Sequence, residues 1–515
     1  MRATEEPTVD VVIVGAGNAA LCSAIAASEN GSKVLVLEKG PEHKRGGNSF
    51  FTDGAIRCAY NDIYGLQSVI PELTDEVIQG TVMPTYQESD FMDDLKRVTK
   101  GKSDPALAQQ LVIESFPTIQ WMHKQGVVFE LNENQYFVEQ GKRQFWGGLP
   151  MKTERKGIGL IETLFNRAIE LGVDVWYGAR AIEIQTEGGK ASAVVVEKDG
   201  TNLQVKTKVV VLACGGFEAN TEKRMEHIGQ EWEKAVVRGS EYNTGDGLEM
   251  ALAIGAQAYG DWSGCHAHTT DYEAPRVGDY AKPGDIYKKS SYPLGLIVNT
   301  GGKRFVDEGA DFRNYTYAKY GKETLKQPNQ KAFQLFDAQV RSHLRTEYDL
   351  EEATCLKADT LDGLAEKMGI DTTAFKETVE TYNQAVQEGD YNPGIKDGKS
   401  TKGVTPPKSN WALRFKQAPF YAYPVTCGIT FTFGGIHVSP EGEVLDKEET
   451  PLPGVFAAGE MVGGLFYHNY PGGSGLMSGA VFGKLAGESA ARFVKRREQE
   501  GVRVGGQNLD SDRTY

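Results

Sequence analysis

Apolar and polar positions near the N-terminus predict a strand, a helix and a second strand in direct succession. Residues 11–14 form a β-branched apolar run bounded by polar residues, which predicts a buried strand. We expect a helix over 18–29 and a further buried strand over 33–37. A β-α-β succession of this kind is typical of a parallel sheet, and it predicts an α/β fold.

The turn between this strand and helix matches the dinucleotide-binding fingerprint G-x-G-x-x-A. Gly15 permits the tight turn, Gly17 lets backbone approach a pyrophosphate, and Ala20 lets the helix pack closely on the strand. The helix N-terminus points its N–H groups and positive dipole end at the phosphates. Glu38 lies about 20 residues further on, where a carboxylate can bind ribose hydroxyls, and it favours FAD or NAD over NADP. The alternative is an ordinary β-α-β unit that binds no nucleotide.

The middle of the chain mixes helical and strand patterns. Residues 70–125 are expected to be mostly helical, 153–171 form another helix, and the alternation over 173–212 predicts antiparallel strands. A short helix is expected over 244–254, and 262–292 has no regular pattern. A mixed α/β segment then continues to about residue 400, where paired prolines and glycines predict a domain boundary.

Further glycine-rich turns are expected to bring backbone close to a ligand. Residues 45–49 suit a loop against a flavin ring, although a plain surface turn is the alternative, and 209–217 is a buried strand that enters a second glycine turn. The start of a helix over 476–493 offers amides and a positive dipole end to the N1–C2=O edge of a flavin. The predicted cofactor-binding residues are Gly15, Gly17, Asn18, Ala19, Ala20, Glu38, Lys39, Gly46, Gly47, Asn48, Ser49, Ala181, Ala213, Gly215, Gly216, Gly245, Asp246, Gly459, Glu460, Ser474, Gly475 and Leu476.

Composition narrows the class of protein. A chain of 515 residues is long enough for two or more domains, and a net charge of −14 disfavours nucleic acid or an anionic membrane as partner. An anionic substrate needs only a local cationic pocket. The six cysteines are scattered without metal-ligand, iron–sulfur or haem-attachment spacing, so we expect reduced thiols, a cytoplasmic location and no metal site. No apolar run is long enough to predict a transmembrane segment.

Taken together, the motifs resemble the flavoprotein family of succinate dehydrogenase and fumarate reductase. The segments VGAGNAA, RGGNS, LACGGF, TGDGLEMALAIGA, GKRFVDE, FTFGGI, VFAAGE and GSGLMSGAVFGKLAG carry the resemblance over nearly the whole chain. WSGCHA, GKRFVDEGADFRNYTYAKYG and HNYPGGSGL make it most similar to FAD-dependent tricarballylate dehydrogenases. The resemblance implies a discontinuous Rossmann-like FAD-binding domain, 1–263 and 406–515, with an inserted α+β substrate-capping domain over 264–405.

Two positions depart from the fumarate reductase pattern. An arginine that clamps the substrate carboxylate in that family is replaced here by Tyr470, and a substrate histidine is replaced by Phe431. A tyrosine at this position also resembles the 3-ketosteroid dehydrogenases, where it binds the substrate carbonyl. Tyr470 and His468 lie on the flavin-facing loop, and a phenol there could hydrogen-bond a carbonyl or carboxylate, or shuttle a proton if its pKa is depressed. Because His43 is closer to the 46–47 glycine pair than the flavin-linked histidine of succinate dehydrogenases is, we expect non-covalent FAD.

The resemblance also implies the remaining catalytic candidates. His266 or His268 falls where the family places a histidine that faces the substrate, and the sequence does not choose between them. Arg313 corresponds to the substrate segment of the capping domain, and Arg341 to an arginine that donates a proton in fumarate reductases. The alternatives are a surface histidine pair, a structural salt bridge at Arg313 and, for Tyr470, a packing role.

The predicted function is that of an FAD-dependent oxidoreductase acting on CH–CH groups. Hydride is expected to pass between flavin N5 and a C–C or C=C bond beside a carboxylate or carbonyl of a small molecule, most readily a small polycarboxylate. An electron acceptor or donor that the sequence does not identify is also required. Tyr470 keeps open an ene-reductase or desaturase acting on a larger ketone or natural product, such as an enone. A non-catalytic flavoprotein or electron-transfer subunit is the other alternative.

Overall fold

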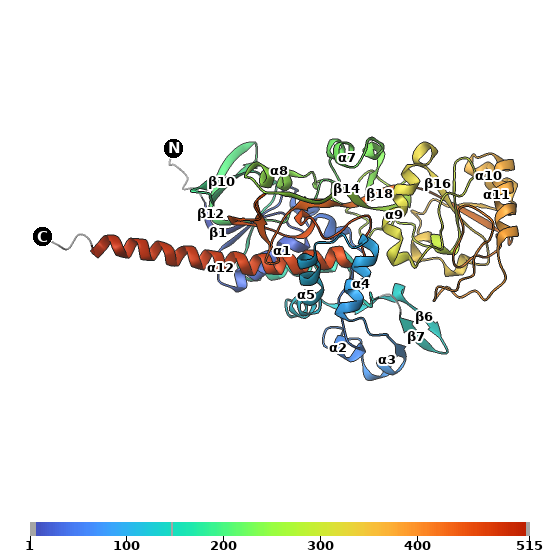
Figure 1. Cartoon of the computed structure of the whole chain (residues 1–515), viewed down its shortest axis with the longest axis horizontal. Helices are drawn as coiled ribbons and strands as arrows, with labels where there is room; N and C mark the ends of the chain where they lie inside the picture. The colour runs from blue at the N-terminus through green and yellow to red at the C-terminus, as the bar shows by residue number, and fades with distance from the viewer. Residues whose placement is uncertain (1–6, 146–147, 511–515) are drawn as a thin grey trace.

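The computed structural model describes residues 7–145 and 148–510, so both ends of the predicted FAD-binding domain, 1–6 and 511–515, lie outside it (Figure 1). The N-terminal β-α-β unit forms as predicted. β1 (Thr8–Val14) leads through α1 (Asn18–Glu29) to β2 (Val34–Leu37), and both strands run parallel. β1 also pairs in parallel with β12 (Thr201–Leu212), and β2 with β9 (Asp174–Trp176).

This sheet is assembled from both ends of the chain. β10 (Ala179–Glu187), β11 (Lys190–Lys198) and β12 form the predicted antiparallel meander. β20 (Pro451–Ala457), from the C-terminal part, then pairs in parallel with β12, and β19 (Glu443–Leu445) pairs with β20. The result is an eight-stranded sheet, which confirms the predicted α/β class and the discontinuous Rossmann-like domain.

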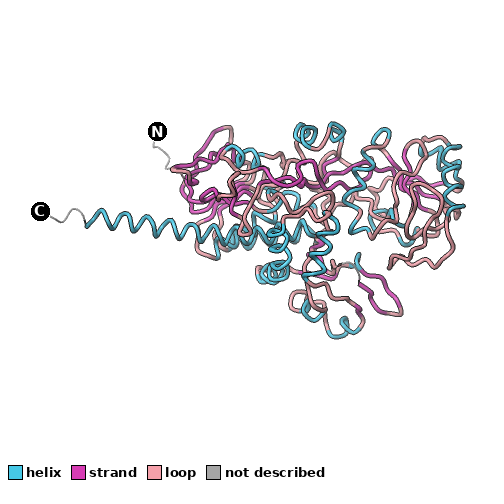
Figure 2. The backbone as a smooth tube through the Cα atoms, viewed as in Figure 1, coloured by secondary structure: helices cyan, strands magenta, loops and turns pink. Residues whose placement is uncertain are grey.

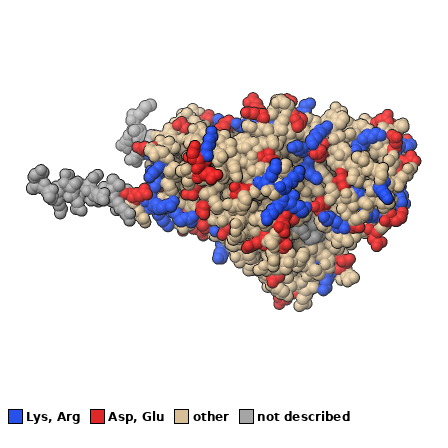
Figure 3. All heavy atoms as spheres, in the orientation of Figure 1, with Lys and Arg blue, Asp and Glu red and all other residues tan. Residues whose placement is uncertain are grey.

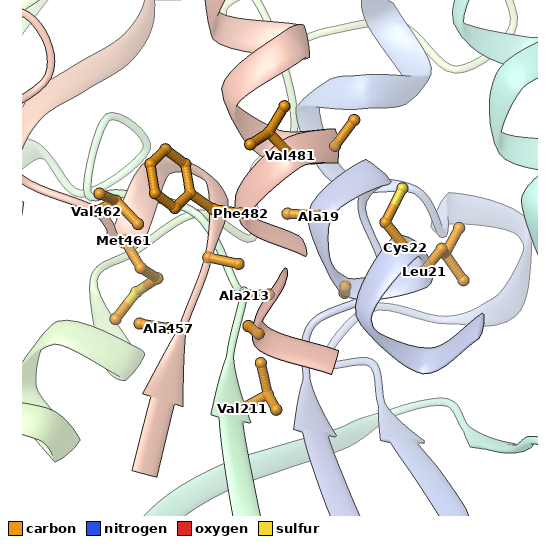
Figure 4. Packing of buried hydrophobic residues seen from close by; sticks show 14 of the residues in the cluster. Ala19, Leu21, Cys22, Val211, Ala213, Ala457, Met461, Val462, Val481 and Phe482 are labelled. Carbon is orange, nitrogen blue, oxygen red and sulfur yellow. The ribbon is translucent and has the colours of Figure 1, made fainter. Parts of the chain in front are cut away.

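The C-terminal helix α12 (Ser474–Asp510) packs directly on α1. Figure 4 shows the start of α12, which carries Val481, next to the part of α1 that carries Ala19 and Cys22, whereas the ring of Phe482 points the other way, toward Val462 and Met461. Ser23 Oγ on α1 donates hydrogen bonds to the backbone oxygens of Gly483 (2.9 Å) and Ala19 (3.0 Å). Because glycine carries no side chain, these two helix backbones can approach within contact distance.

The helix predicted to end at Phe493 instead continues to Asp510, and its C-terminal part projects beyond the rest of the molecule (Figure 2). The residues after Phe493 include Lys, Arg, Glu and Gln, which are good helix formers, so the helix continues where the apolar periodicity is lost.

A second sheet carries the part of the chain predicted as the cap. The long strands β14 (Ala258–Asp271) and β18 (Phe420–Ile436) run antiparallel, and β16 (Ala332–Phe336) pairs with β18. The prediction that 262–292 is irregular is therefore wrong as far as Asp271. The histidines and threonines of this segment are buried by pairing with β18, and that long-range contact leaves no local signature. The remaining strands of this sheet are β13 (Val236–Val237), β15 (Leu296–Asn299) and β17 (Leu356–Ala358).

Helices and short sheets complete the structure around these two sheets. The hydrophobic core between α1, α12 and the eight-stranded sheet is separate from the smaller core of the cap around Phe333, Leu364 and Phe375. The other helices are α2 (Ile63–Gln67), α3 (Asp75–Gln79), α4 (Glu88–Thr99), α5 (Pro105–Lys124), α6 (Lys156–Glu170), α7 (Thr221–His227), α8 (Asp246–Ala253), α9 (Tyr317–Leu325), α10 (Leu361–Met368) and α11 (Thr372–Ala385), and the other strands are β3 (Ala55–Ile56), β4 (Thr81–Val82), β5 (Phe129–Leu131), β6 (Tyr136–Glu139), β7 (Lys142–Phe145) and β8 (Met151–Thr153).

The two predicted domain boundaries stay predictions. Residue 264 lies inside β14, so a strand continues across it, and residue 405 precedes β18 by 15 residues. Among the helices of the described chain, none combines the length and apolar character needed to cross a bilayer. The predicted cytoplasmic location is not tested by this observation.

Replacing Gly483 by alanine should loosen the α1–α12 contact. A Cβ at Gly483 would lie 2.5 Å from the backbone oxygen of Ala19, and neither backbone can move without disturbing the helix pair. We expect the free energy of unfolding to fall by about 1–3 kcal/mol, as for overpacking of a core, measured by denaturant titration.

Gly479→Ala is the matched control, because its Cβ would meet the side-chain nitrogen of Asn18 at 3.1 Å and no backbone atom closer than 3.9 Å. In the control, the helix propensity of alanine should offset the crowding to within about 1 kcal/mol. Equal losses in both variants would show that the close approach at Gly483 does not matter for stability.

Candidate active site

A cavity of about 310 Å³ has walls from both parts of the molecule. One wall, which we call the glycine wall, comes from the β1–α1 turn, residues 47–49, the end of β12 and the start of α12. A further part of the lining, which we call the cap wall, comes from Arg238, from β14 and from residues 285–345. The cavity therefore lies where the N-terminal β-α-β unit meets the predicted cap, at the carboxyl ends of β1 and β12, where α/β sheets bind ligands.

Gly15 and Gly17 have different physical reasons to be glycine. Gly15 has a left-handed φ of +104°, and a Cβ there would lie 2.5 Å from the backbone oxygen of Ala213, so the turn itself requires glycine. A Cβ at Gly17 would meet nothing closer than Ser49 Oγ at 3.5 Å. The protein alone would tolerate a side chain at Gly17, and what the glycine preserves is space in the cavity. This fits the approach of a pyrophosphate.

Glu38 lies in the cavity wall beyond this turn and is 7% exposed. Its Oε1 accepts a hydrogen bond of 2.6 Å from the backbone N–H of Gly40. Burial raises the pKa of Glu38 to about 7, against the opposing effects of the Gly40 N–H and the Lys39 charge. Lys39 forms an ion pair of 2.9 Å with Asp246, which also lines the cavity. A carboxyl group placed in this way can bind the hydroxyls of an adenosine ribose.

Of the predicted cofactor-binding residues, some line the cavity and others do not. Ala20, Gly46, Gly216, Gly245 and Ser474 do not line the cavity. The predicted residues that line it are Gly15, Gly17, Asn18, Ala19, Glu38, Lys39, Gly47, Asn48, Ser49, Ala181, Ala213, Gly215, Asp246, Gly459, Glu460, Gly475 and Leu476.

Asn48 connects the glycine wall to a buried pair of carboxyl groups. Its Nδ2 donates to Thr430 O and to Glu218 Oε1, each at 2.6 Å, and Asn243 Nδ2 donates to the same Glu218 oxygen at 2.6 Å. Glu218 Oε2 has no hydrogen-bond donor among the described residues, and the carboxyl group of Glu460 interacts with Glu218 directly. Burial and then the Glu460 carboxylate raise the pKa of Glu218 well above its ordinary value, so Glu218 holds a proton between the two groups.

Cations gather on the cap wall, and most of them are neutralised. Arg238 pairs with Asp285 and donates to Thr430 Oγ1 at 2.7 Å, and Lys288 pairs with Asp53 at 2.7 Å. These pairs lower the net charge of the wall without removing its hydrogen-bond donors.

Arg345 pairs with Glu347 at 3.1 Å. Arg313 has no ion pair or side-chain hydrogen bond within the described part of the chain, and its guanidinium carbon lies 5.8 Å from the ring centre of Tyr317. Burial lowers the pKa of Arg313 to about 10, which still leaves it charged at neutral pH. A half-buried cation that lines a cavity without a carboxylate partner is suited to bind an anion.

A cluster of aromatic side chains also lines the cavity. His266 stacks on Phe431 with ring centres 5.4 Å apart, and both of its ring nitrogens lack a hydrogen-bond partner among the described residues. The hydroxyl groups of Tyr317 and Tyr470 hydrogen-bond to each other beside it. Burial raises the pKa of Tyr470 well above its ordinary value, which keeps the phenol protonated and able to donate. The shuttle expected for a depressed pKa is therefore not supported.

His268 is buried and has a partner for each ring nitrogen. Its Nδ1 lies 2.7 Å from the backbone oxygen of Thr269, and its Nε2 lies 3.2 Å from Ser290 Oγ. Both His266 and His268 line the cavity, as do Arg313 and Ser290, so the structure brings the expected histidines and arginine together.

Arg341 and His468 lie outside this group. Arg341 begins the short helix at 341–343, pairs with Asp349 and lies over the ring of Tyr421 at 5.4 Å, and it does not reach the cavity. His468 is exposed, has a left-handed φ of +61° and does not line the cavity. The structure therefore gives no support to a catalytic role for either residue.

Several lining residues were not predicted from the sequence, namely Arg238, Lys288, Ser290, Tyr317 and Arg345. Tyr317 lies inside a motif that carries the family resemblance, so the signal for it was present. The other four lie in segments without a periodic pattern, and only the tertiary fold brings them to the cavity. Within residues 7–145 and 148–510, no cluster of three or more His, Cys, Asp or Glu side chains is arranged to hold a metal.

Comparisons with known proteins identify relatives of the whole chain. The family model described as FAD binding domain matches residues 10–476. Fumarate reductase (cytochrome) of Shewanella frigidimarina is 29% identical over 500 residues, which cover 95% of this chain and 78% of that protein. The 3-oxosteroid 1-dehydrogenase of Mycolicibacterium smegmatis is 25% identical over 568 residues, which cover 93% of this chain and 96% of that protein. The solved structure of an open flavocytochrome c3 fumarate reductase superposes with a TM-score of 0.72 at 27% identity, covering 95% of this chain and 79% of that one.

Gly17→Val should remove the cofactor and leave the protein folded. The new side chain would point into the cavity, where a pyrophosphate needs close backbone approach, and it meets no protein atom closer than 3.5 Å at its Cβ. Wild-type protein should be yellow and release FAD into the supernatant on acid precipitation, whereas the variant should be colourless with an unchanged thermal midpoint. A variant that retains FAD would contradict this placement of the pyrophosphate.

Glu218→Gln should change how stability depends on pH. The folded-state pKa of Glu218 is raised, so wild-type protein loses unfolding free energy as pH rises from about 4.5 towards that folded-state value. Glutamine keeps both amide contacts and does not titrate, so the thermal midpoint of the variant relative to wild type should rise between pH 5 and pH 8. Glu222→Gln, an exposed change on α7, is the control. A difference that does not depend on pH would contradict proton storage at Glu218.

Proposed function

The chain belongs to the FAD-binding-domain family that includes the fumarate reductase flavoproteins, and from this membership we propose that it acts on the C–C bond beside a carboxylate of a small polycarboxylate. It is an FAD-dependent oxidoreductase of CH–CH or C=C groups. The observation that carries the finer proposal is the half-buried guanidinium of Arg313, which lines the cavity and has no ion pair among the described residues. A substrate of the tricarballylate type, as the sequence motifs suggest, has the carboxylates that such a wall would bind.

The glycine wall has the features that an FAD molecule needs. Gly17 keeps space for the pyrophosphate, Glu38 offers a carboxyl group to the ribose, and the N-terminus of α12 lines the cavity at Gly475. When bound, FAD supplies a hydride acceptor or donor at N5 of its ring. The contribution of this chain is to hold the substrate and to manage its charge and its proton.

Charge on the cap wall favours an anionic substrate. Arg238, Lys288 and Arg345 each have a carboxylate partner, and Arg313 remains without one among the described side chains. A substrate carboxylate on Arg313 would complete the neutralisation, and a charge-assisted contact of this kind contributes about 1.5–3 kcal/mol. Figure 3 shows Lys and Arg gathered near the middle of the visible face, although the chain carries a net charge of −14. The acidic composition is therefore compatible with an anionic ligand.

A second candidate substrate is a neutral enone or ketone. Tyr470 replaces the carboxylate-clamping arginine, and its phenol is paired with that of Tyr317 and stays protonated. A protonated phenol donates a hydrogen bond to a carbonyl oxygen whose negative charge grows during reaction. The relative named 3-oxosteroid 1-dehydrogenase supports this alternative. The electron partner and the cytoplasmic location remain parts of the proposal, as does non-covalent binding of FAD.

Arg313→Ala decides between these substrates. If a carboxylate binds the guanidinium, KM for tricarballylate should rise about 10-fold or more, in line with the loss of about 1.5–3 kcal/mol of binding. Steady-state turnover with a reducible dye as acceptor measures this effect.

Arg341→Ala is the matched control, because it removes an arginine that the structure places outside the cavity. Its KM should equal that of wild type. If Arg341→Ala loses activity and Arg313→Ala does not, the result contradicts the Arg313 site and supports a proton-donor role for Arg341. Faster turnover of neutral enones than of carboxylates by wild-type enzyme would favour the second candidate.

A further inference from the structure

We propose that Ser290 and His268 form a proton relay that removes a proton from the substrate carbon beside the carboxylate. The inference rests on the proposed function, because Arg313 must hold the carboxylate. It goes further because it identifies the base. It also states that the enzyme at rest is ready to accept a proton from the substrate, as dehydrogenation requires. Ser290 is the new catalytic residue, and it belongs to a segment in which the sequence showed no pattern.

The hydrogen-bond donors and acceptors around His268 determine which ring nitrogen carries the proton. The backbone oxygen of Thr269 lies 2.7 Å from Nδ1, and a carbonyl oxygen can only accept, so Nδ1 is the protonated nitrogen. Thr269 Oγ1 lies 3.3 Å from the same nitrogen, but its hydroxyl hydrogen is donated to the Lys289 backbone oxygen at 2.9 Å. Nε2 is then left with a lone pair. The Ser290 hydroxyl, 3.2 Å away, is the donor to that lone pair. The chain of bonds therefore runs from Ser290 through His268 to the backbone, in the direction that takes up a proton.

Hydrogen bonds from neighbouring side chains hold His268 and Ser290 in position. Thr269 Oγ1, next to His268, donates to the backbone oxygen of Lys289, next to Ser290, at 2.9 Å. Gln334 Nε2 donates to Thr269 Oγ1 at 3.1 Å and to the same Lys289 oxygen at 3.0 Å. His268 and Ser290 are each 1% exposed, yet both line the cavity. A base held this rigidly needs no rearrangement before it reacts.

The relay accounts for every atom of the proton transfer. The substrate C–H bond beside the carboxylate breaks, its proton goes to Ser290 Oγ, and the Ser290 proton goes to His268 Nε2. The electron pair of that bond becomes the C=C bond as hydride leaves the neighbouring carbon for the flavin that this family uses. The substrate thus loses one proton and one hydride, and the relay gains one proton.

The other candidate catalytic residues are arranged less well for this role. Neither nitrogen of His266 has a partner among the described residues, so nothing fixes its tautomer. Tyr317 and Tyr470 both have a raised pKa, chiefly through burial, and remain protonated. Arg341 does not reach the cavity. In the described part of the site, only His268 offers a nitrogen lone pair that already accepts a hydrogen bond from a side chain.

The surroundings of His268 favour its neutral, proton-accepting form. The titratable groups near it are Arg238, His266, Arg313 and Tyr317, and among the described residues no carboxylate is hydrogen-bonded to its ring. Burial, and then the charges of these arginines, lower the pKa of His268 well below 6.5. The rate of dehydrogenation should therefore be flat through neutral pH, whereas the reverse reduction, which needs protonated His268, should rise as pH falls.

Stopped-flow reduction of the bound flavin by tricarballylate tests the relay in three variants. Ser290→Ala should slow the reduction on the order of 10²-fold, the size of a general-base contribution, and should enlarge the isotope effect of deuterium beside the carboxylate. Ser290→Thr keeps the hydroxyl and should restore the rate to within about 10-fold. Ser263→Ala, on the exposed part of β14, is the control with no expected effect. FAD content and thermal midpoint should be unchanged in all three variants.

An unchanged rate and isotope effect in Ser290→Ala would overturn the relay while leaving the Arg313 site intact. If wild-type flavin is not reduced by tricarballylate or any other polycarboxylate, the proposed function fails instead. In that case, ¹⁵N NMR of histidine-labelled protein still decides the hydrogen-bond order. A protonated Nδ1 with an Nε2 signal that shifts in Ser290→Ala supports the relay, and a protonated Nε2 overturns it.

Discussion

The antiparallel pairing of β14 with β18 is the contact on which the candidate site depends. It places His266 opposite Phe431 and His268 opposite Gly428, so one ladder sets the positions of both histidines relative to the residues after Thr430. Thr430 O in turn accepts from Asn48 of the glycine wall, and Thr430 Oγ1 accepts from Arg238 of the cap wall. The two walls are thereby fixed against each other by backbone pairing and a few buried hydrogen bonds, which is what a reaction that needs precise placement requires.

The charges of the site follow from the same arrangement. Burying several unpaired arginines and lysines would destabilise the folded protein. Arg238, Lys288 and Arg345 avoid this because each forms an ion pair with a carboxylate. Arg313 is the exception among the cations that line the described cavity, and a substrate carboxylate is the partner that would complete it. No cation pairs with Glu218 or Glu460 among the described residues, and burial raises the pKa of both carboxyl groups, which favours retention of a proton by the pair.

The sequence could predict the features that depend on neighbouring residues. It could not predict those that depend on pairing between distant parts of the chain. The β1-α1-β2 unit, Gly15, Gly17 and Glu38 were predictable because the turn, the helix start and the acid follow one another within 31 residues. β14 was read as irregular because its polar residues are buried only by pairing with β18, more than 150 residues away. Ser290 had no local signal for the same reason. The resemblance placed Arg341 near the substrate, but the short helix at 341–343 pairs it with Asp349 instead.

Anaerobic titration of the oxidised enzyme with tricarballylate and with its neutral trimethyl ester tests the central claim most directly. The two compounds share a carbon skeleton and differ in charge, so the comparison isolates the anion site built around Arg313. The account predicts that the acid bleaches the flavin absorbance and that the ester does not at the same concentration. Bleaching by the ester or by a neutral ketosteroid, with none by the acid, would contradict it and assign the cavity to an uncharged substrate.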